Sequence, residues 1–336
     1  MMNRVFILLF FSFRMVLAQP GANDQLFWPK PPEKARIKFL YSFSCKQDLG
    51  IKKSFWHKIA DFLFGEEHEF DRLARPQGIT VDAGGRIYVT DMGARGVHVF
   101  DFAKKEYQLF QGTSEQHFVS PVSVAVGDNG TRYVSDSELN TVFIFDADWG
   151  YRYSIRNGLQ RPTGIWFNEG LLYVVDTGLN QIVVFDANGV EQRRFGKRGV
   201  ERGEFNYPVY LCLAHPSESS AQTRMYVVDA LNFRLQILQS DGAFQSMFGI
   251  LGDGFGRFAR PKGVALDSEG HIYVADALFD VIQIFDQRGE ILMAFGGSGS
   301  AAGRFSLPAG IAMDSNDRLY VVDSGNRRIQ VFQYLK

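Results

Sequence analysis

The chain repeats one four-residue motif six times, and this repetition constrains the fold more than any other feature of the sequence. The motif is Tyr-Val-x-Asp, and its copies end at Asp91, Asp136, Asp176, Asp229, Asp276 and Asp323. One proline precedes each copy, at Pro76, Pro121, Pro162, Pro208, Pro261 and Pro308. These prolines lie about 46 residues apart on average, a period that indicates an array of similar structural units.

Each unit has the pattern of four short antiparallel strands. In the fifth copy an apolar run at 263–267 is followed by turn residues, and further strands are predicted at 271–276, 281–285 and 290–295. Turn residues recur about every ten positions, as they do in antiparallel sheet. Four strands in about 46 residues match one propeller blade. The sequence therefore predicts an all-β fold, a six-bladed β-propeller of four-stranded antiparallel blades over residues 35–336.

Further motifs recur where one copy joins the next. Arg-Pro-x-Gly stands at 75–78, 161–164 and 260–263, and Phe-Gly is followed by Gly-x-Phe within 195–205, 248–258 and 295–305. Together with Asn326-Arg327, these motifs make the chain resemble NHL repeats, a family that forms six-bladed propellers. The second and fourth copies depart from the pattern, with Pro121-Val122-Ser123, Pro208-Val209-Tyr210 and an insertion at 215–224. Because of those departures, the resemblance is a weaker guide to functional residues in this chain than to its fold.

The last copy supplies only three strands before the chain ends at Lys336. Residues 37–43 alternate with a period of two and can provide the missing outer strand. Joining the two ends of the chain in one blade removes an open sheet edge, which would otherwise favour aggregation. We therefore predict that 37–43 is the closing strand of the propeller.

The first residues have the pattern of a targeting segment. Arg4 precedes an apolar run, and Val16-Leu17-Ala18 suits a signal peptidase, so residues 1–18 are predicted to be a signal peptide. The alternative is a membrane anchor, which the short stretch interrupted by Arg14 disfavours. Residues 19–34 are predicted to be an extended linker. Export to the periplasm or the extracellular space follows from this interpretation.

Residues 52–64 show the one helical pattern, with apolar side chains from Phe55 to Leu63 on one face. This predicted short N-terminal helix either packs on the propeller or binds a partner or a membrane, and membrane contact is expected only here. The chain has two cysteines, Cys45 and Cys212, which we expect to be buried and unpaired.

No catalytic arrangement is recognisable in the sequence. The inner strands do not repeat a histidine at an equivalent position, so the zinc ligands that amidating lyases of this architecture carry are missing. The six repeated aspartates occur in every copy, which indicates a structural role as acceptors of backbone N–H groups. No nucleophile elbow or phosphate loop is present. We therefore predict no catalytic residue, no metal site and no cofactor.

One constellation suits a binding site. The inner strands of copies one, three and five begin with Arg75 and Gln77, Arg161 and Thr163, and Arg260 and Lys262. At the mouth of a central channel, three arginines on alternate blades could hold a carboxylate or a polyanion. The alternative is that each arginine pairs with a neighbouring repeat aspartate. A net charge of −1 and predicted export disfavour nucleic acid as a partner.

These patterns predict an exported, monomeric propeller that acts as a non-catalytic scaffold. Its unknown protein or anionic ligand would bind at the channel-mouth face that carries the three arginines. The alternative function is a metal-dependent lyase- or hydrolase-like enzyme with its site in the central channel.

Overall fold

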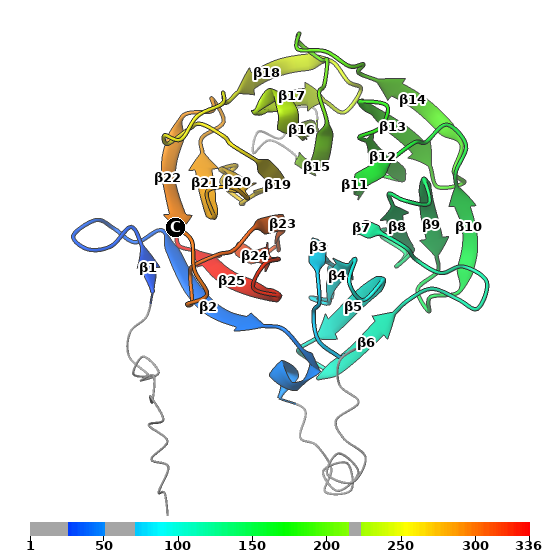
Figure 1. Cartoon of the computed structure of the whole chain (residues 1–336), viewed down its shortest axis with the longest axis horizontal. Coiled ribbons are helices and arrows are strands. Elements are labelled where there is room, and N and C mark those ends of the chain that lie inside the picture. Colours follow the sequence, from blue (N-terminus) through cyan, green and yellow to red (C-terminus); the bar gives the residue numbers. More distant parts are fainter. Residues whose placement is uncertain (1–25, 51–70, 215–222) are drawn as a thin grey trace, which may run out of the picture.

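The computed structural model describes residues 26–50, 71–214 and 223–336 of the chain. In these residues the strands form six antiparallel sheets, which stand around a central axis as blades (Figure 1). The six-bladed β-propeller predicted from the repeat is therefore confirmed. The predicted signal peptide 1–18, the helix 52–64 and most of the insertion after Ala214 lie outside the described residues.

Each blade runs from an inner strand at the axis to an outer strand at the rim. The inner strands are β3 (Pro76–Val81), β7 (Pro121–Val126), β11 (Pro162–Asn168), β15 (Pro208–Ala214), β19 (Pro261–Leu266) and β23 (Pro308–Met313). The second strands are β4 (Ile87–Asp91), β8 (Arg132–Asp136), β12 (Leu171–Asp176), β16 (Arg224–Asp229), β20 (Ile272–Asp276) and β24 (Arg318–Asp323).

The third strands are β5 (Gly96–Asp101), β9 (Thr141–Phe145), β13 (Gln181–Asp186), β17 (Arg234–Gln239), β21 (Val281–Phe285) and β25 (Arg328–Tyr334). The outer strands are β6 (Glu106–Phe110), β10 (Tyr151–Ile155), β14 (Glu191–Phe195), β18 (Phe244–Phe248), β22 (Ile291–Gly296) and β2 (Ile37–Phe43). Within the described residues the helices are the short 3-10 turns η1 (Lys46–Leu49) and η2 (Ala230–Asn232), and none is long and apolar enough to cross a membrane.

The Tyr-Val-x-Asp motif forms the second strand of every blade. Every residue of β4, β8 and β20 is buried, because neighbouring blades cover both faces of each sheet. The outer strands are half-exposed, as in the pattern of β18. Both described cysteines, Cys45 and Cys212, are buried and unpaired, as predicted. Buried tyrosine and valine side chains thus fill the spaces between blades.

The Phe-Gly and Gly-x-Phe motifs lock consecutive blades together. Phe258 is completely buried, and its ring lies against Gly249, where φ is +99° and an added Cβ would come within 2.5 Å of the ring. Phe205 and Phe305 repeat this contact in the neighbouring junctions. Glycine is required here both for the left-handed backbone and for the close approach of the ring.

Changing Gly249 to alanine should destabilise the domain by about 2–4 kcal/mol, because backbone strain and an overpacked ring contact add. The matched control is Gly170→Ala, where φ is +78° but no atom lies within 4 Å of the added Cβ. That control should cost only the backbone strain, about 1 kcal/mol. Denaturant unfolding measures both variants, and equal losses would show that the ring contact is unimportant.

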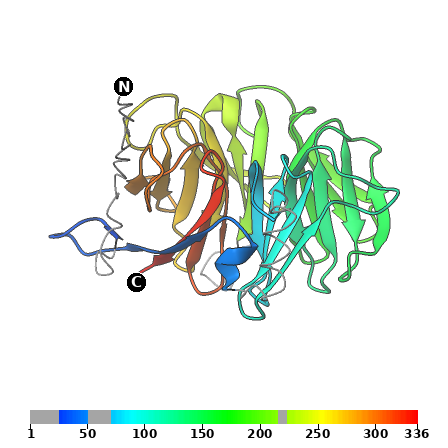
Figure 2. The same ribbon diagram turned by 60° about the horizontal axis from the view of Figure 1, so that its bottom comes forward.

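The closing strand lies where the alternating pattern places it. β2 is antiparallel to β25, with Ile37 opposite Tyr334 and Phe43 opposite Ile329, and it runs along the rim of the last blade (Figures 1 and 2). Three strands of the sixth blade, β23, β24 and β25, come from the end of the chain. Its outer strand, β2, comes from the beginning of the chain. The two ends of the chain therefore close one sheet.

The predicted linker 19–34 contains a strand in its described part. Residues of β1 (Phe27–Trp28) pair with β2, which gives the sixth blade a fifth strand. The Trp28 ring lies 5.5 Å from the ring of Phe295 and 5.9 Å from that of Phe332. Burial of these aromatic surfaces holds the segment against the blade, so residues 27–28 are not an extended linker.

Candidate functional site

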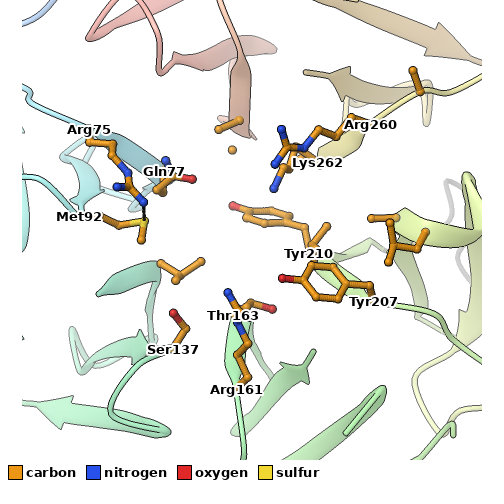
Figure 3. A pocket seen from close by; sticks show the side chains of 18 residues that line it. Arg75, Gln77, Met92, Ser137, Arg161, Thr163, Tyr207, Tyr210, Arg260 and Lys262 are labelled. Atoms are coloured by element: carbon orange, nitrogen blue, oxygen red, sulfur yellow. Dashed lines mark hydrogen bonds between the residues drawn. The ribbon is translucent and has the colours of Figure 1, made fainter. Parts of the chain in front are cut away.

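The starts of the inner strands surround a cavity of about 550 Å³ on the propeller axis (Figure 3). All six residues predicted for the site line it, two from each of blades one, three and five: Arg75, Gln77, Arg161, Thr163, Arg260 and Lys262. Blades two and four contribute Ser137 and Tyr207 between them. The register of the repeat thus brings the six predicted side chains, from positions up to 187 residues apart, into one pocket.

The repeat aspartates fix the start of each arginine-bearing strand. Asp91 accepts the backbone N–H of Arg75 at 2.9 Å, and Asp176 accepts that of Arg161 at 3.0 Å. Asp276 does the same for Arg260 at 2.9 Å. Each carboxylate also binds the turn that follows it. The structural role predicted for these aspartates is therefore confirmed.

The guanidinium groups of these arginines have no carboxylate partner among the described residues. Within residues 26–50, 71–214 and 223–336, no salt bridge joins Arg75, Arg161 or Arg260 to an acidic side chain. Arg75 contacts the sulfur of Met92 at 3.7 Å, and Arg161 lies over the ring of Tyr207 at 5.7 Å. The alternative pairing with repeat aspartates is wrong, because Asp91, Asp176 and Asp276 bind the backbone N–H groups of these arginines and not their guanidinium groups.

The pocket concentrates positive charge. Burial of Lys262, together with the charges of Arg260 and Arg161, lowers the pKa of its ammonium group to about 8. The residues that line the pocket include no aspartate or glutamate. Nearby positive charges lower the pKa of a lysine when no acidic group of the protein compensates them.

Tyr210 forms the floor of the pocket, and its role was not recognised in the sequence. It replaces the glycine of Pro-x-Gly, which in blade three is Gly164 and in blade five is Gly263. Its hydroxyl donates across the axis to the carbonyl oxygen of Ile79 at 3.3 Å, and its ring lies in the centre of Figure 3. Burial raises the pKa of this phenol. The departure of the fourth copy from the repeat was the signal that could have revealed it.

The lining of the pocket does not fit a divalent metal. Such ions bind carboxylates, imidazoles or thiolates, whereas this pocket offers cationic groups, amides and hydroxyls. In the described part of the chain, no three His, Cys, Asp or Glu side chains converge as a possible metal site. His98 is buried in β5 beside Asp91 and Tyr107, away from the pocket lining. His57, His68 and His215 lie outside the described residues.

Comparison with known families agrees with this geometry. The NHL repeat model matches residues 73–98, 258–280 and 305–332, in blades one, five and six. The chain is a six-bladed β-propeller that contains NHL repeats. A curated relative, a probable peptidyl-alpha-hydroxyglycine alpha-amidating lyase of Caenorhabditis elegans, is 34% identical over 79 residues. That match covers 21% of this NHL propeller and 23% of the relative's length.

Solved structures share the architecture of this NHL propeller at low identity. Virginiamycin B lyase from Staphylococcus aureus is 14% identical, with a TM-score of 0.56, and the match covers 79% of this chain and 97% of that one. An auxiliary nutrient binding protein from Bacteroides thetaiotaomicron is 16% identical, with a TM-score of 0.59 and coverages of 78% and 69%. At these identities the similarity shows the fold alone, and the fold serves both enzymes and binding proteins.

Proposed function

We propose that this protein is an exported, non-catalytic binding propeller whose pocket at the channel mouth holds an anionic group of its ligand. The observation that carries the proposal is the set of three guanidinium groups and Lys262 around a cavity without an acidic side chain. The three arginines are exposed and Lys262 is half-buried. Positive charge gathered at the mouth of a cavity attracts anions and raises their local concentration. Arginine forks on alternate blades can donate several charge-assisted hydrogen bonds to carboxylate oxygens.

Export rests on the signal-like residues 1–18, which place the binding face outside the cytoplasm. The pocket itself suits an anion with more than one negative charge. Its cations come from three directions, so a ligand with a single carboxylate would leave at least two of them unneutralised. Thr163 and Ser137 offer hydroxyl groups for neutral parts of the same ligand.

Citrate, a compact tricarboxylate, is the first probe for the pocket. Titration calorimetry should detect its binding to the wild-type protein, and Arg161→Ala should weaken that binding about 10- to 100-fold, the loss of one or two charge-assisted hydrogen bonds. The control variant is Arg152→Ala, because Arg152 lies on the outer strand β10 with an exposed side chain. Equal affinity in wild type and Arg161→Ala would show that the arginines have only a structural role.

The affinity for citrate should depend on pH through Lys262. The pKa of this ammonium is about 8 in the free protein, so the lysine is charged below pH 8 and neutral above it. An anion binds the charged form better, and affinity should therefore fall as the pH rises through 8. In Lys262→Met this step should disappear while the contribution of the arginines remains. A wild-type affinity that is constant from pH 6.5 to 9.5 would contradict the assignment.

The alternative function is a metal-dependent lyase- or hydrolase-like propeller. It is favoured by the 34% identity with a probable amidating lyase over 79 residues. Metal analysis of the purified protein distinguishes the two functions. One equivalent of zinc or calcium that persists through purification would support the enzyme and count against the binding scaffold.

A further inference from the structure

The loops around the pocket all lie on one face of the propeller. Neighbouring strands are antiparallel, so the turn between the second and third strands lies at the end of the blade where the inner strand begins. The loop from each outer strand to the next blade reaches the same end. We call this end of the molecule the mouth face.

Exposed apolar side chains gather on the mouth face of blades four and five and the start of blade six. They form what we call the apolar arc: Leu231, Ile250, Leu251, Phe255, Leu278 and Leu307. Phe255 is 80% exposed and Leu278 is 61% exposed. Val200 is also exposed, in the loop that leads into blade four, whereas on blades one and two the described part of this face has one exposed large apolar side chain, Leu139. The arc is therefore confined to one side of the mouth.

The arc is displayed by loops that are held in place. The backbone N–H of Phe258, whose side chain is completely buried, donates to the carbonyl oxygen of Ile250 at 2.9 Å. Leu251 forms an isolated bridge with the same phenylalanine. At the other end of the arc, the N–H of Leu307 donates to Asp280 at 2.7 Å. These apolar side chains therefore face solvent because the backbone is fixed there, and a ligand would bind them at little entropic cost.

The arc continues directly into the cationic pocket. Leu231 belongs to the arc and lines the pocket, and Arg260 directly precedes β19, the strand that follows the loop carrying Phe255. A small anion would satisfy the charges and leave the arc in water. A ligand that carries carboxylates beside apolar side chains would cover both surfaces. Large apolar side chains exposed together on one face are typical of protein interaction sites.

The charges around the arc are of both signs. Asp253 and Asp280 lie among its residues, and Arg257 and Arg304 lie in the same loops. A bilayer of anionic lipids favours a uniformly basic surface, whereas a polypeptide can match mixed charges. Charge complementarity thus favours a protein partner over a membrane.

From this juxtaposition we infer that the ligand is an acidic–apolar segment of a partner protein. Its carboxylates bind Arg161, Arg260 and Lys262 in the pocket, and the apolar side chains next to them pack on the arc. This inference rests on the proposed anion-binding function of the pocket and adds the chemical class of the ligand.

An array of immobilised 12-residue peptides tests the inference with labelled full-length protein. Four peptide classes are compared: acidic with apolar residues, acidic with polar residues, basic with apolar residues and neutral with apolar residues. The acidic–apolar class should retain at least tenfold more protein than the acidic–polar class. The double variant Phe255→Ser and Leu278→Ser should abolish that difference. Val190→Ser and Leu292→Ser, which change exposed apolar side chains away from the mouth face, should preserve it.

The outcomes separate the two levels of the proposal. Equal retention of both acidic classes would overturn the role of the arc and leave the anion pocket intact. If peptides with and without acidic residues retain the same amount of protein, both the role of the arc and the anion pocket are overturned. Arg161→Ala combined with Arg260→Ala should reduce binding of both acidic classes. If the protein instead floats with phosphatidylcholine–phosphatidylglycerol vesicles, depends on Phe255 and shows no peptide preference, the arc is a membrane contact and the inference is wrong.

Discussion

A chain that begins at residue 44 should fail to form the stable propeller that a chain beginning at residue 19 forms. The deletion removes β1 and β2 and exposes the edge of β25. It also removes the side chains of Ile37 and Phe43, which are 0% and 2% exposed, and uncovers Phe332. Burial of each such side chain contributes about 1.5–3 kcal/mol to the free energy of unfolding. The deletion should therefore cost about 5 kcal/mol or more, which approaches the whole stability of a typical domain.

Calorimetry and size-exclusion chromatography measure this effect. The shortened chain should lose its cooperative thermal transition and associate through the open strand edge. A synthetic peptide of residues 26–43, added during refolding, should restore the transition by completing the sixth blade. An unchanged melting temperature for the shortened chain would show that the strand does not close the ring.

The second large effect is expected at Asp323, whose carboxylate connects three parts of the sixth blade. It accepts the backbone N–H of Ser306 at 2.7 Å, the Nε of Arg328 at 2.7 Å and the amide of Gln330 at 3.0 Å. Arg328 in turn donates to the carbonyl oxygen of Ala301 in the loop that enters the blade. Asp323→Ala should destabilise the protein by about 3–5 kcal/mol, because it leaves a half-buried arginine without its counter-charge and the donors of Ser306 and Gln330 without their acceptor.

A double-mutant cycle separates this ion pair from the other bonds of the carboxylate. Arg328→Met keeps much of the side-chain volume and removes the charge. If the pair is coupled, Asp323→Ala with Arg328→Met should be about 1–3 kcal/mol less destabilising than the sum of the single variants. Urea unfolding of the four proteins provides the values. Strictly additive losses would show that the backbone bonds of Asp323, and not the arginine, carry its effect.

The fold was predictable because it follows from repetition. Six repeats with turn residues about every ten positions are compatible with few architectures. The alternation of residues 37–43 identified the outer strand that closes the ring. The structural role of Asp91 and its equivalents also followed from their presence in every copy. Residues 27–28 were harder to predict, since a two-residue strand has no periodicity and depends on the aromatic surface that Trp28 contacts.

The sequence by itself determined the six blades and the gathering of Arg75, Arg161 and Arg260 on one face, because equivalent positions of a repeat occupy equivalent positions in the ring. Only the tertiary structure decided that no described carboxylate pairs with these guanidinium groups, because that depends on where each side chain points in the closed ring. The same holds for Tyr210, which bonds to Ile79 across the axis from 131 residues away. Such contacts depend on the closed ring: the departure of the fourth copy from the repeat marks Tyr210 as unusual, but it does not indicate the residue that Tyr210 contacts.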